Sequence, residues 1–185
     1  MTDSWRGYHL IGGNVALDLV NTVSWRLAPE RTFDRLEMPG FLPLWLDRTG
    51  LTAGATLAAE TELISSLSRL RETVYRLLVA TDQADIARFG EWLTAARGLA
   101  VAGPSLPLRW IVPIEGPGDV VPALTLAADE LLRSAEAAVV RQCSGPGCGW
   151  LFLDRTRNHS RQWCSSQDCG NRERARRHYR RSQGA

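Results

Sequence analysis

The sequence contains no lysine, so all 22 residues in its count of Lys and Arg are arginine. It also has only three histidines and no long apolar run. No apolar segment approaches the roughly 18 residues that a membrane-spanning helix requires. The first residues, Met1 to Arg6, also lack the apolar stretch of a secretion signal. We therefore expect a cytoplasmic protein that has no membrane partner.

The absence of lysine is typical of a codon-biased genome, so the arginine content alone does not indicate a nucleic-acid partner. The position of the charges is more informative. Residues 1–140 hold 12 Arg and 17 acidic residues, a formal charge of −5, whereas residues 141–185 hold 10 Arg and 3 acidic residues, a charge of +7. The net charge of +2 therefore conceals two parts of opposite sign.

Residues 1–140 are predicted to form a multihelical domain. Gly12-Gly13-Asn14 is typical of a turn and helix cap, and an apolar helix follows it. Pro39-Gly40 precedes a second short helix, which is expected to end at Thr49-Gly50. Apolar residues then recur at steps of three and four, and we expect longer helices over three segments: about 56–80, 83–100 and 122–140.

One short β element is expected within this helical domain. Leu106, Leu108, Trp110 and Val112 alternate with other residues as in a half-buried strand, and prolines and glycines flank them. The segment therefore predicts a strand or small hairpin. The last helix runs into Cys143 with almost no linker, so the two parts of the chain should be rigidly coupled. The predicted fold class is mainly α, with a minor β component.

The four cysteines have the spacing of a zinc site. Cys143-x4-Cys148 and Cys164-x4-Cys169 are separated by 15 residues, and two close pairs can surround one tetrahedral Zn²⁺. A reducing compartment disfavours disulfides. Four thiolates close the coordination shell, which disfavours a catalytic zinc. His159 is an alternative ligand, but it falls in a predicted turn.

The surrounding residues predict the shape of the finger. A glycine-rich knuckle is followed by a strand over 150–154, a polar turn over 155–159 and a returning segment over 161–163. Ser165 then caps a terminal helix, which places Cys169 in its first turn. Knuckle, hairpin and ligand-bearing helix together describe a treble-clef-like finger. A finger of 45 residues buries too little apolar surface to be stable by itself, so zinc should contribute to the folding of the finger.

The terminal helix carries a dense positive charge on one face. At about 100° per residue, an arc of about 200° holds six arginines: Arg172, Arg174, Arg176, Arg177, Arg180 and Arg181. Asn171, Ala175, His178 and Tyr179 fill the remaining arc, which is expected to pack on the zinc hairpin. Arginine suits phosphate because it donates planar, bidentate hydrogen bonds. We therefore expect DNA binding; the alternative is a protein-interaction module whose basic helix docks on an acidic surface.

Two polar residues of the first predicted helix leave a second question open. Asp18 and Asn21 lie three residues apart on one face, where they could line a small-molecule pocket or hydrogen-bond the adjacent loop, to Arg26 or Arg31 for example. Five tryptophans in this part could line such a pocket or fill the core: Trp5, Trp25, Trp45, Trp92 and Trp110. No nucleophile and base stand at a recognisable spacing, so no catalytic residue is predicted.

Two segments resemble known families. Cys148-Gly149-Trp150-Leu151-Phe152-x-Asp154, then Trp163-Cys164-Ser165, Cys169-Gly170-Asn171-Arg172 and the end His178-Tyr179-Arg180-Arg181 resemble the CGNR zinc finger. Gly12 to Thr22 and Leu44-Trp45-Leu46 resemble the ABATE domain that usually precedes this finger. The resemblance implies a bacterial, stress-responsive transcription regulator, with zinc held by the four cysteines and nucleoid DNA as its target. It divides the chain into 1–140 and 141–185, and leaves a homodimer and a small-molecule effector open.

Overall fold

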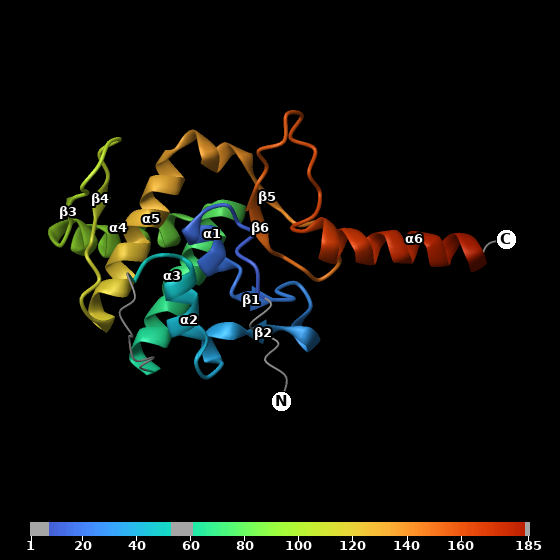
Figure 1. Cartoon of the computed structure of the whole chain (residues 1–185), viewed down its shortest axis with the longest axis horizontal. Coiled ribbons are helices and arrows are strands. Elements are labelled where there is room, and N and C mark those ends of the chain that lie inside the picture. The colour runs from blue at the N-terminus through green and yellow to red at the C-terminus, as the bar shows by residue number, and fades with distance from the viewer. Residues whose placement is uncertain (1–7, 53–60, 184–185) are drawn as a thin grey trace.

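The computed structural model describes residues 8–52 and 61–183. In Figure 1, a body of packed helices lies beside a small C-terminal finger, from which one long helix projects. Five helices form the body within the described residues: α1 (Val15–Val20), α2 (Phe41–Arg48), α3 (Thr61–Val79), α4 (Gln83–Gly98) and α5 (Val120–Arg133). The sixth, α6 (Asn171–Gln183), is the projecting helix. None of the helices in these ranges is both long and apolar enough to cross a membrane.

The predicted caps begin these helices. The Asn14 side chain accepts a hydrogen bond from the Ala16 amide at 2.9 Å, and Gly40 takes the left-handed conformation directly before α2. Leu57, part of the predicted pattern over 56–80, lies outside the described residues. The core joins α1, α2, α3 and α5 through fully buried side chains such as Leu17, Trp45, Leu67 and Leu124.

Three antiparallel hairpins complete the fold of residues 8–52 and 61–183. β1 (Val23–Ser24) pairs with β2 (Phe33–Asp34), β3 (Val101–Ala102) pairs with β4 (Trp110–Ile111), and β5 (Val140–Gln142) pairs with β6 (Leu151–Leu153). Each strand has only two or three residues. The mainly α fold class with a minor β component is therefore confirmed.

The helix predicted over 122–140 is shorter than expected. It ends at Arg133, because Ser134 has an extended backbone and its hydroxyl caps a 3₁₀ helix, Ala135–Val139, by accepting from the Glu136 amide at 3.2 Å. This side-chain cap competes with the continuation of the α-helix. The chain therefore changes direction between α5 and β5.

The hairpin expected near 105–122 is present, but the prediction of a half-buried face was wrong. Leu106 and Trp110 are 88% and 62% exposed, and Leu108 is also exposed. Val112 alone of the four alternating residues is buried, against Ala96 and Leu126. The rest of the hairpin extends beyond the surface that α4 and α5 provide, so its apolar side chains meet solvent.

The strand predicted over 150–154 forms, but its expected partner was wrong. It pairs with β5, which precedes the first cysteine pair, with Gln142 opposite Leu151. The returning segment 161–163 is held instead by the Asp154 carboxylate, which accepts from the Thr156 amide at 3.0 Å, the Thr156 hydroxyl at 2.6 Å and the Arg161 amide at 3.0 Å. These bonds curl the loop around one side chain and replace a ladder of backbone hydrogen bonds.

The finger hairpin is part of the core of the body. Leu151 and Leu153 are buried in the same cluster as the helices. The Asn21 side chain donates to the Leu151 carbonyl and accepts from the Leu151 amide, both at 2.8 Å, as a neighbouring strand would. The Trp150 indole N–H donates to the Val23 carbonyl at 2.7 Å. Body and finger therefore share one core, in agreement with close coupling.

Replacing Asn21 with alanine should weaken this junction. The change leaves the buried amide and carbonyl of Leu151 without their partners, at about 1–3 kcal/mol for each unsatisfied group. We expect a loss of about 2–4 kcal/mol in the free energy of unfolding, measured by urea denaturation. Asn14→Ala is the matched control, because it removes only a helix cap and should cost about 1 kcal/mol. A smaller loss for Asn21→Ala than for Asn14→Ala would contradict the proposed junction.

Candidate metal centre and nucleic-acid interface

The four cysteines meet at one point. Their Sγ atoms all lie within 4.8 Å of one another, and all four side chains are buried. The distance between Sγ atoms is 3.8 Å for Cys148 and Cys164, and 3.6 Å for Cys164 and Cys169. Four sulfurs at 2.3 Å from a tetrahedral zinc ion stand about 3.8 Å apart. The set therefore fits a closed, structural Zn²⁺ site.

Each cysteine comes from a different local structure. Cys143 directly follows β5, and Cys148 lies in the turn before β6. Cys164 follows the loop over 155–163, called the Asp154 loop because the Asp154 carboxylate organises it, and Cys169 lies in a π-helical turn, Ser166–Gly170. The Ser165 hydroxyl caps this turn by accepting from the amides of Gln167 and Asp168, both at 3.2 Å, as the sequence predicted.

Gly145 leaves the space that the sulfurs need. A Cβ atom at this position would lie 2.8 Å from the Sγ atom of Cys169 and 3.3 Å from that of Cys143. Gly149 has a similar role at the junction, because its φ is +73° and a Cβ atom there would lie 2.8 Å from the Cβ atom of Arg26. The glycines of the knuckle thus permit both the thiol cluster and the contact with the body.

Donors around the cluster favour thiolates. The Cys143 sulfur accepts from the Cys164 amide at 3.2 Å and from the Gly145 amide at 3.4 Å. The Arg172 guanidinium donates to the Cys169 sulfur at 2.9 Å. Hydrogen bonds among the four sulfurs lower the pKa of Cys143 and Cys169 and raise the pKa of Cys148 and Cys164. A four-thiolate zinc site carries a charge of −2, and these donors offset part of it.

His159 is not part of this cluster. Its ring Nδ1 lies 2.8 Å from the carbonyl oxygen of Asp154, inside the loop that the Asp154 side chain organises. The metal-compatible group in the described residues consists of the four cysteines. Asp154 itself is fully buried, and its position within the CGNR-like segment is the only signal that the sequence offered for its role.

Arg172 connects the metal centre to the body. Besides its hydrogen bond to Cys169, its guanidinium carbon lies 4.6 Å from the centre of the Trp25 ring, and that of Arg31 lies 3.4 Å from the same ring. Trp25 has a positive φ of 55°, which is unusual for a residue with a side chain. The stacked arginines hold this ring in place. Sequence reasoning assigned Arg172 to DNA and missed its contact with Trp25.

The terminal helix does not pack on the hairpin. It was expected to bury the arc that contains Ala175, His178 and Tyr179, but these residues are exposed, Tyr179 by 62%. The helix leaves the finger along its own axis and points away from the body, as Figure 1 shows. Its sides therefore face solvent over most of their length.

The six arginines of α6 fall into two groups. Arg172 and Arg174 hold the base of the helix, Arg174 by donating to the Ser166 carbonyl at 3.0 Å. The other four lie further along the exposed helix: Arg176, Arg177, Arg180 and Arg181. Arg180 pairs with Glu173 of the same helix at 3.1 Å, and Arg177 approaches the same carboxylate at 3.8 Å.

Asp18 and Asn21 are both buried and both bonded to backbone. The Asp18 carboxylate accepts from the Gly12 amide at 2.8 Å, and Asn21 holds Leu151. Burial raises the pKa of Asp18 to about 6, although backbone hydrogen bonds oppose the shift. Arg26, considered above as a partner, instead donates to the Val20 carbonyl at 2.9 Å and pairs with Glu72. This geometry supports the structural interpretation of the pair.

The tryptophans of the body have different environments. Trp45 is buried in the core, the Trp25 ring contacts the guanidinium groups of Arg31 and Arg172, and Trp110 is exposed. Trp5 lies outside the described residues. The expectation that these side chains fill the core therefore applies to Trp45 but is wrong for Trp110.

Cys164→Ser tests the metal centre. We expect the purified variant to retain no zinc, against one ion per wild-type chain, measured by atomic absorption. Its melting temperature should also fall, because zinc binding contributes folding free energy. Helical circular dichroism from α1 to α5 should largely persist. Ser160→Ala, an exposed change in the neighbouring loop, is the control; full zinc retention in Cys164→Ser would contradict the four-cysteine ligand set.

Comparison with protein families agrees with this geometry. Residues 140–182 match the family model of the CGNR zinc finger. Residues 13–143 match the ABATE family, which is described as "Putative stress-induced transcription regulator". A search of the curated proteins finds no significant match. The two matched ranges overlap at β5 and Cys143, where the body and the finger join. Because the second match spans well over half of the sequence, the chain belongs to the ABATE family of regulators and carries a zinc-binding CGNR finger.

Proposed function

We propose that the protein is a non-enzymatic, zinc-dependent transcription regulator that binds DNA through α6. Residues 1–140 form its regulatory body and residues 141–185 its DNA-binding finger. The observation that carries the proposal is that α6 projects from the finger with four arginines exposed along its length. This role places the protein in the cytoplasm, on the nucleoid.

The dimensions of α6 suit the major groove. Thirteen residues at 1.5 Å per residue give a helix about 20 Å long. The major groove of B-DNA is about 12 Å wide and admits one α-helix. Because α6 buries none of its own side chains, every face near its end is free to approach phosphates or base edges.

The charge of α6 also favours an anionic partner. Six arginines oppose only Glu173 on this helix, and repulsion between like charges destabilises an isolated basic helix. Arg172 and Arg174 are engaged at its base. We therefore assign phosphate and base contacts to Arg176, Arg177, Arg180 and Arg181, and assign to Arg172 and Arg174 the task of orienting the helix.

One form of the alternative, in which α6 docks on the acidic body, finds no support. Within residues 8–52 and 61–183, the ion pairs of the α6 arginines are with Glu173 on the same helix. The axis of α6 also points away from the body (Figure 1). An acidic surface on another protein is the remaining form, and the salt experiment below distinguishes it from DNA.

Binding of duplex DNA should depend steeply on salt. If each of the four arginines neutralises one phosphate, the plot of log K against log salt should have a slope of about −3.6. Fluorescence anisotropy with a labelled duplex, from about 50 to 200 mM salt, measures this slope. Zinc-loaded protein that shows no DNA binding at low salt would rule out the proposal and favour the acidic-protein alternative.

Single substitutions test the assignment of contacts. Arg176→Ala should reduce the slope by about 0.9, the contribution of one phosphate. Arg69→Ala on α3 is the control, because Arg69 is an exposed arginine on the body that donates to Ser66 of the same helix, and the change should leave the slope unchanged. An unaltered slope in Arg176→Ala would place the DNA contact elsewhere.

The body has a second part in this proposal. It senses a small-molecule effector or mediates assembly into a homodimer, and the shared core conveys its state to the finger. The contacts that Asn21, Trp150 and Trp25 make across the junction support such coupling. Any change in the body that moves β6 or Trp25 would alter the orientation of α6.

A further inference from the structure

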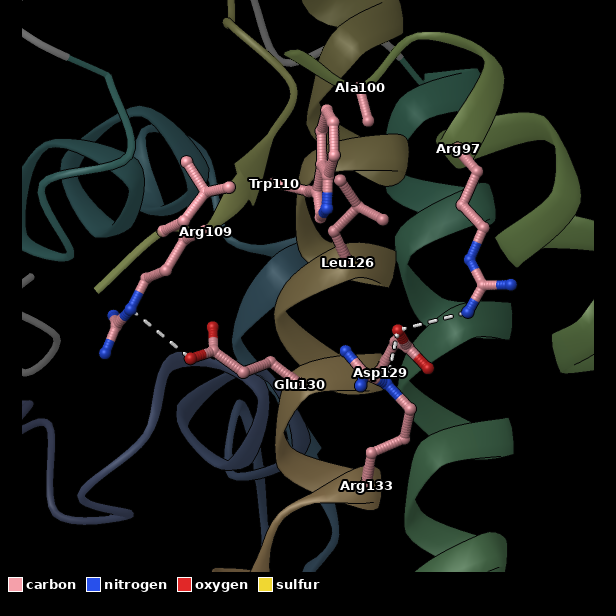
Figure 2. Close-up of a pocket in the computed structure, with 9 residues that line it drawn as sticks. Arg97, Ala100, Arg109, Trp110, Leu126, Asp129, Glu130 and Arg133 are labelled. Atoms are coloured by element: carbon pink, nitrogen blue, oxygen red, sulfur yellow. Dashed lines mark hydrogen bonds and ion pairs between the residues drawn. The ribbon is translucent and has the colours of Figure 1, made fainter. Parts of the chain in front are cut away.

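A cavity of about 570 Å³ lies between the β3–β4 hairpin and the helices α4 and α5. Its volume is within the range of small-molecule sites in proteins. Figure 2 shows Trp110 from β4 beside Leu126 of α5, with Arg97 of α4 on one side and Arg109 on the other. The cavity is far from the four cysteines along the chain, and neither the zinc site nor the DNA contacts use it.

One wall of the cavity is apolar and includes exposed side chains. Leu126 and Ala100 form its inner surface, and Leu108 and Trp110 stand over them with most of their area in solvent. An exposed indole beside a preformed hollow is a typical feature of a binding site, because leaving so large an apolar surface in water is unfavourable. A flat aromatic ring would cover this wall.

The polar residues that line the cavity have an excess of positive charge. The Asp129 carboxylate, only 10% exposed, accepts from Arg133 Nε at 2.9 Å and also faces Arg97 Nη2 at 3.6 Å. The Arg109 Nε atom lies 3.4 Å from a Glu130 oxygen. Three guanidinium groups thus share two carboxylates. One positive charge is left over, and the outer N–H groups of Arg97 and Arg133 can donate to a further anion.

We propose that this cavity binds a small aromatic carboxylate. The ring lies against Trp110 and Leu126, and the carboxylate accepts hydrogen bonds from Arg97 and Arg133 beside Asp129. This inference rests on the sensing role proposed for the body and gives that role a site and a ligand class. It differs from the pair Asp18 and Asn21, whose polar atoms are already bonded within the protein.

The position of the cavity offers a route to the finger. Arg133 is the last residue of α5, and Ser134 follows it, where the chain turns toward β5 and the first cysteine. Farther along, the Nε atom of Arg155 in the finger donates to the Glu136 carboxylate at 3.1 Å. A ligand that draws Arg133 away from Asp129 would therefore act at the start of the segment that connects body and finger.

Isothermal titration calorimetry with 2-naphthoate tests the proposal on the zinc-loaded full chain. We expect saturable binding, and a much weaker response to 2-naphthamide, which has the same ring system without the charge. Arg97→Gln should weaken binding by roughly ten-fold, the loss of one charged hydrogen bond. Trp110→Ala should weaken it through loss of the ring contact. Circular dichroism confirms that each variant folds.

Arg88→Gln is the matched control. Arg88 is on the same helix, is similarly exposed and faces Asp85 at 3.7 Å, but does not line the cavity. The affinity of the Arg88→Gln variant for 2-naphthoate should equal that of the wild type. Equal affinities for Arg97→Gln and Arg88→Gln, equal binding of the amide, or no heat at all would each overturn the proposal.

A second copy of the chain is the competing occupant of this face. If sedimentation velocity shows a dimer that Trp110→Ala dissociates, and 2-naphthoate does not bind, then the hairpin is an interface and the proposal is wrong. Neither calorimetry nor sedimentation involves DNA. A failure here is therefore distinct from a failure of α6 to bind a duplex.

Discussion

The convergence of four thiols on one zinc ion is the constraint on which the C-terminal part depends. Residues 143 and 169 are 26 positions apart, and the four cysteines bring the knuckle, the loop after Asp154 and the π-helical turn before α6 to one point. The finger has little apolar interior of its own beyond the cysteines and Phe152. Without the metal, four buried thiols would offer little cohesion, and the direction of α6 would be undetermined.

The body supplies the second constraint. Asn21 pairs with Leu151 as a strand would, and Leu151 and Leu153 complete the helical core. Arg172 then joins Trp25 of the body to Cys169 of the metal centre. Since Leu151 and Arg172 each lie three residues after a cysteine of the cluster, the body and the metal centre together determine where α6 points. In the proposed function, these links are the route by which a signal received by the body alters DNA binding.

Local sequence signals predicted part of this structure. Asn14, Gly40 and Ser165 gave correct helix starts because a cap depends on neighbouring residues alone. Cysteine spacing predicted the thiol cluster because two close pairs around a short insert are typical of a single zinc site. The exposure of Trp110 and the contact between Arg172 and Trp25 could not be predicted, because each depends on segments distant in sequence. The pairing of β6 with β5 was missed because the helix predicted over 122–140 left no strand before Cys143. Alternating apolar residues indicate a strand but not the surface it covers.

The central claim is that zinc orders α6 and that DNA then covers it. Hydrogen–deuterium exchange of the zinc-loaded protein, with and without duplex DNA at low salt, tests this claim most directly. The end of α6, from Arg176 to Arg181, should exchange rapidly in the free protein, because its side chains are exposed, and should become protected on DNA binding. Protection that appears only in the body, with α6 unchanged, would contradict the account.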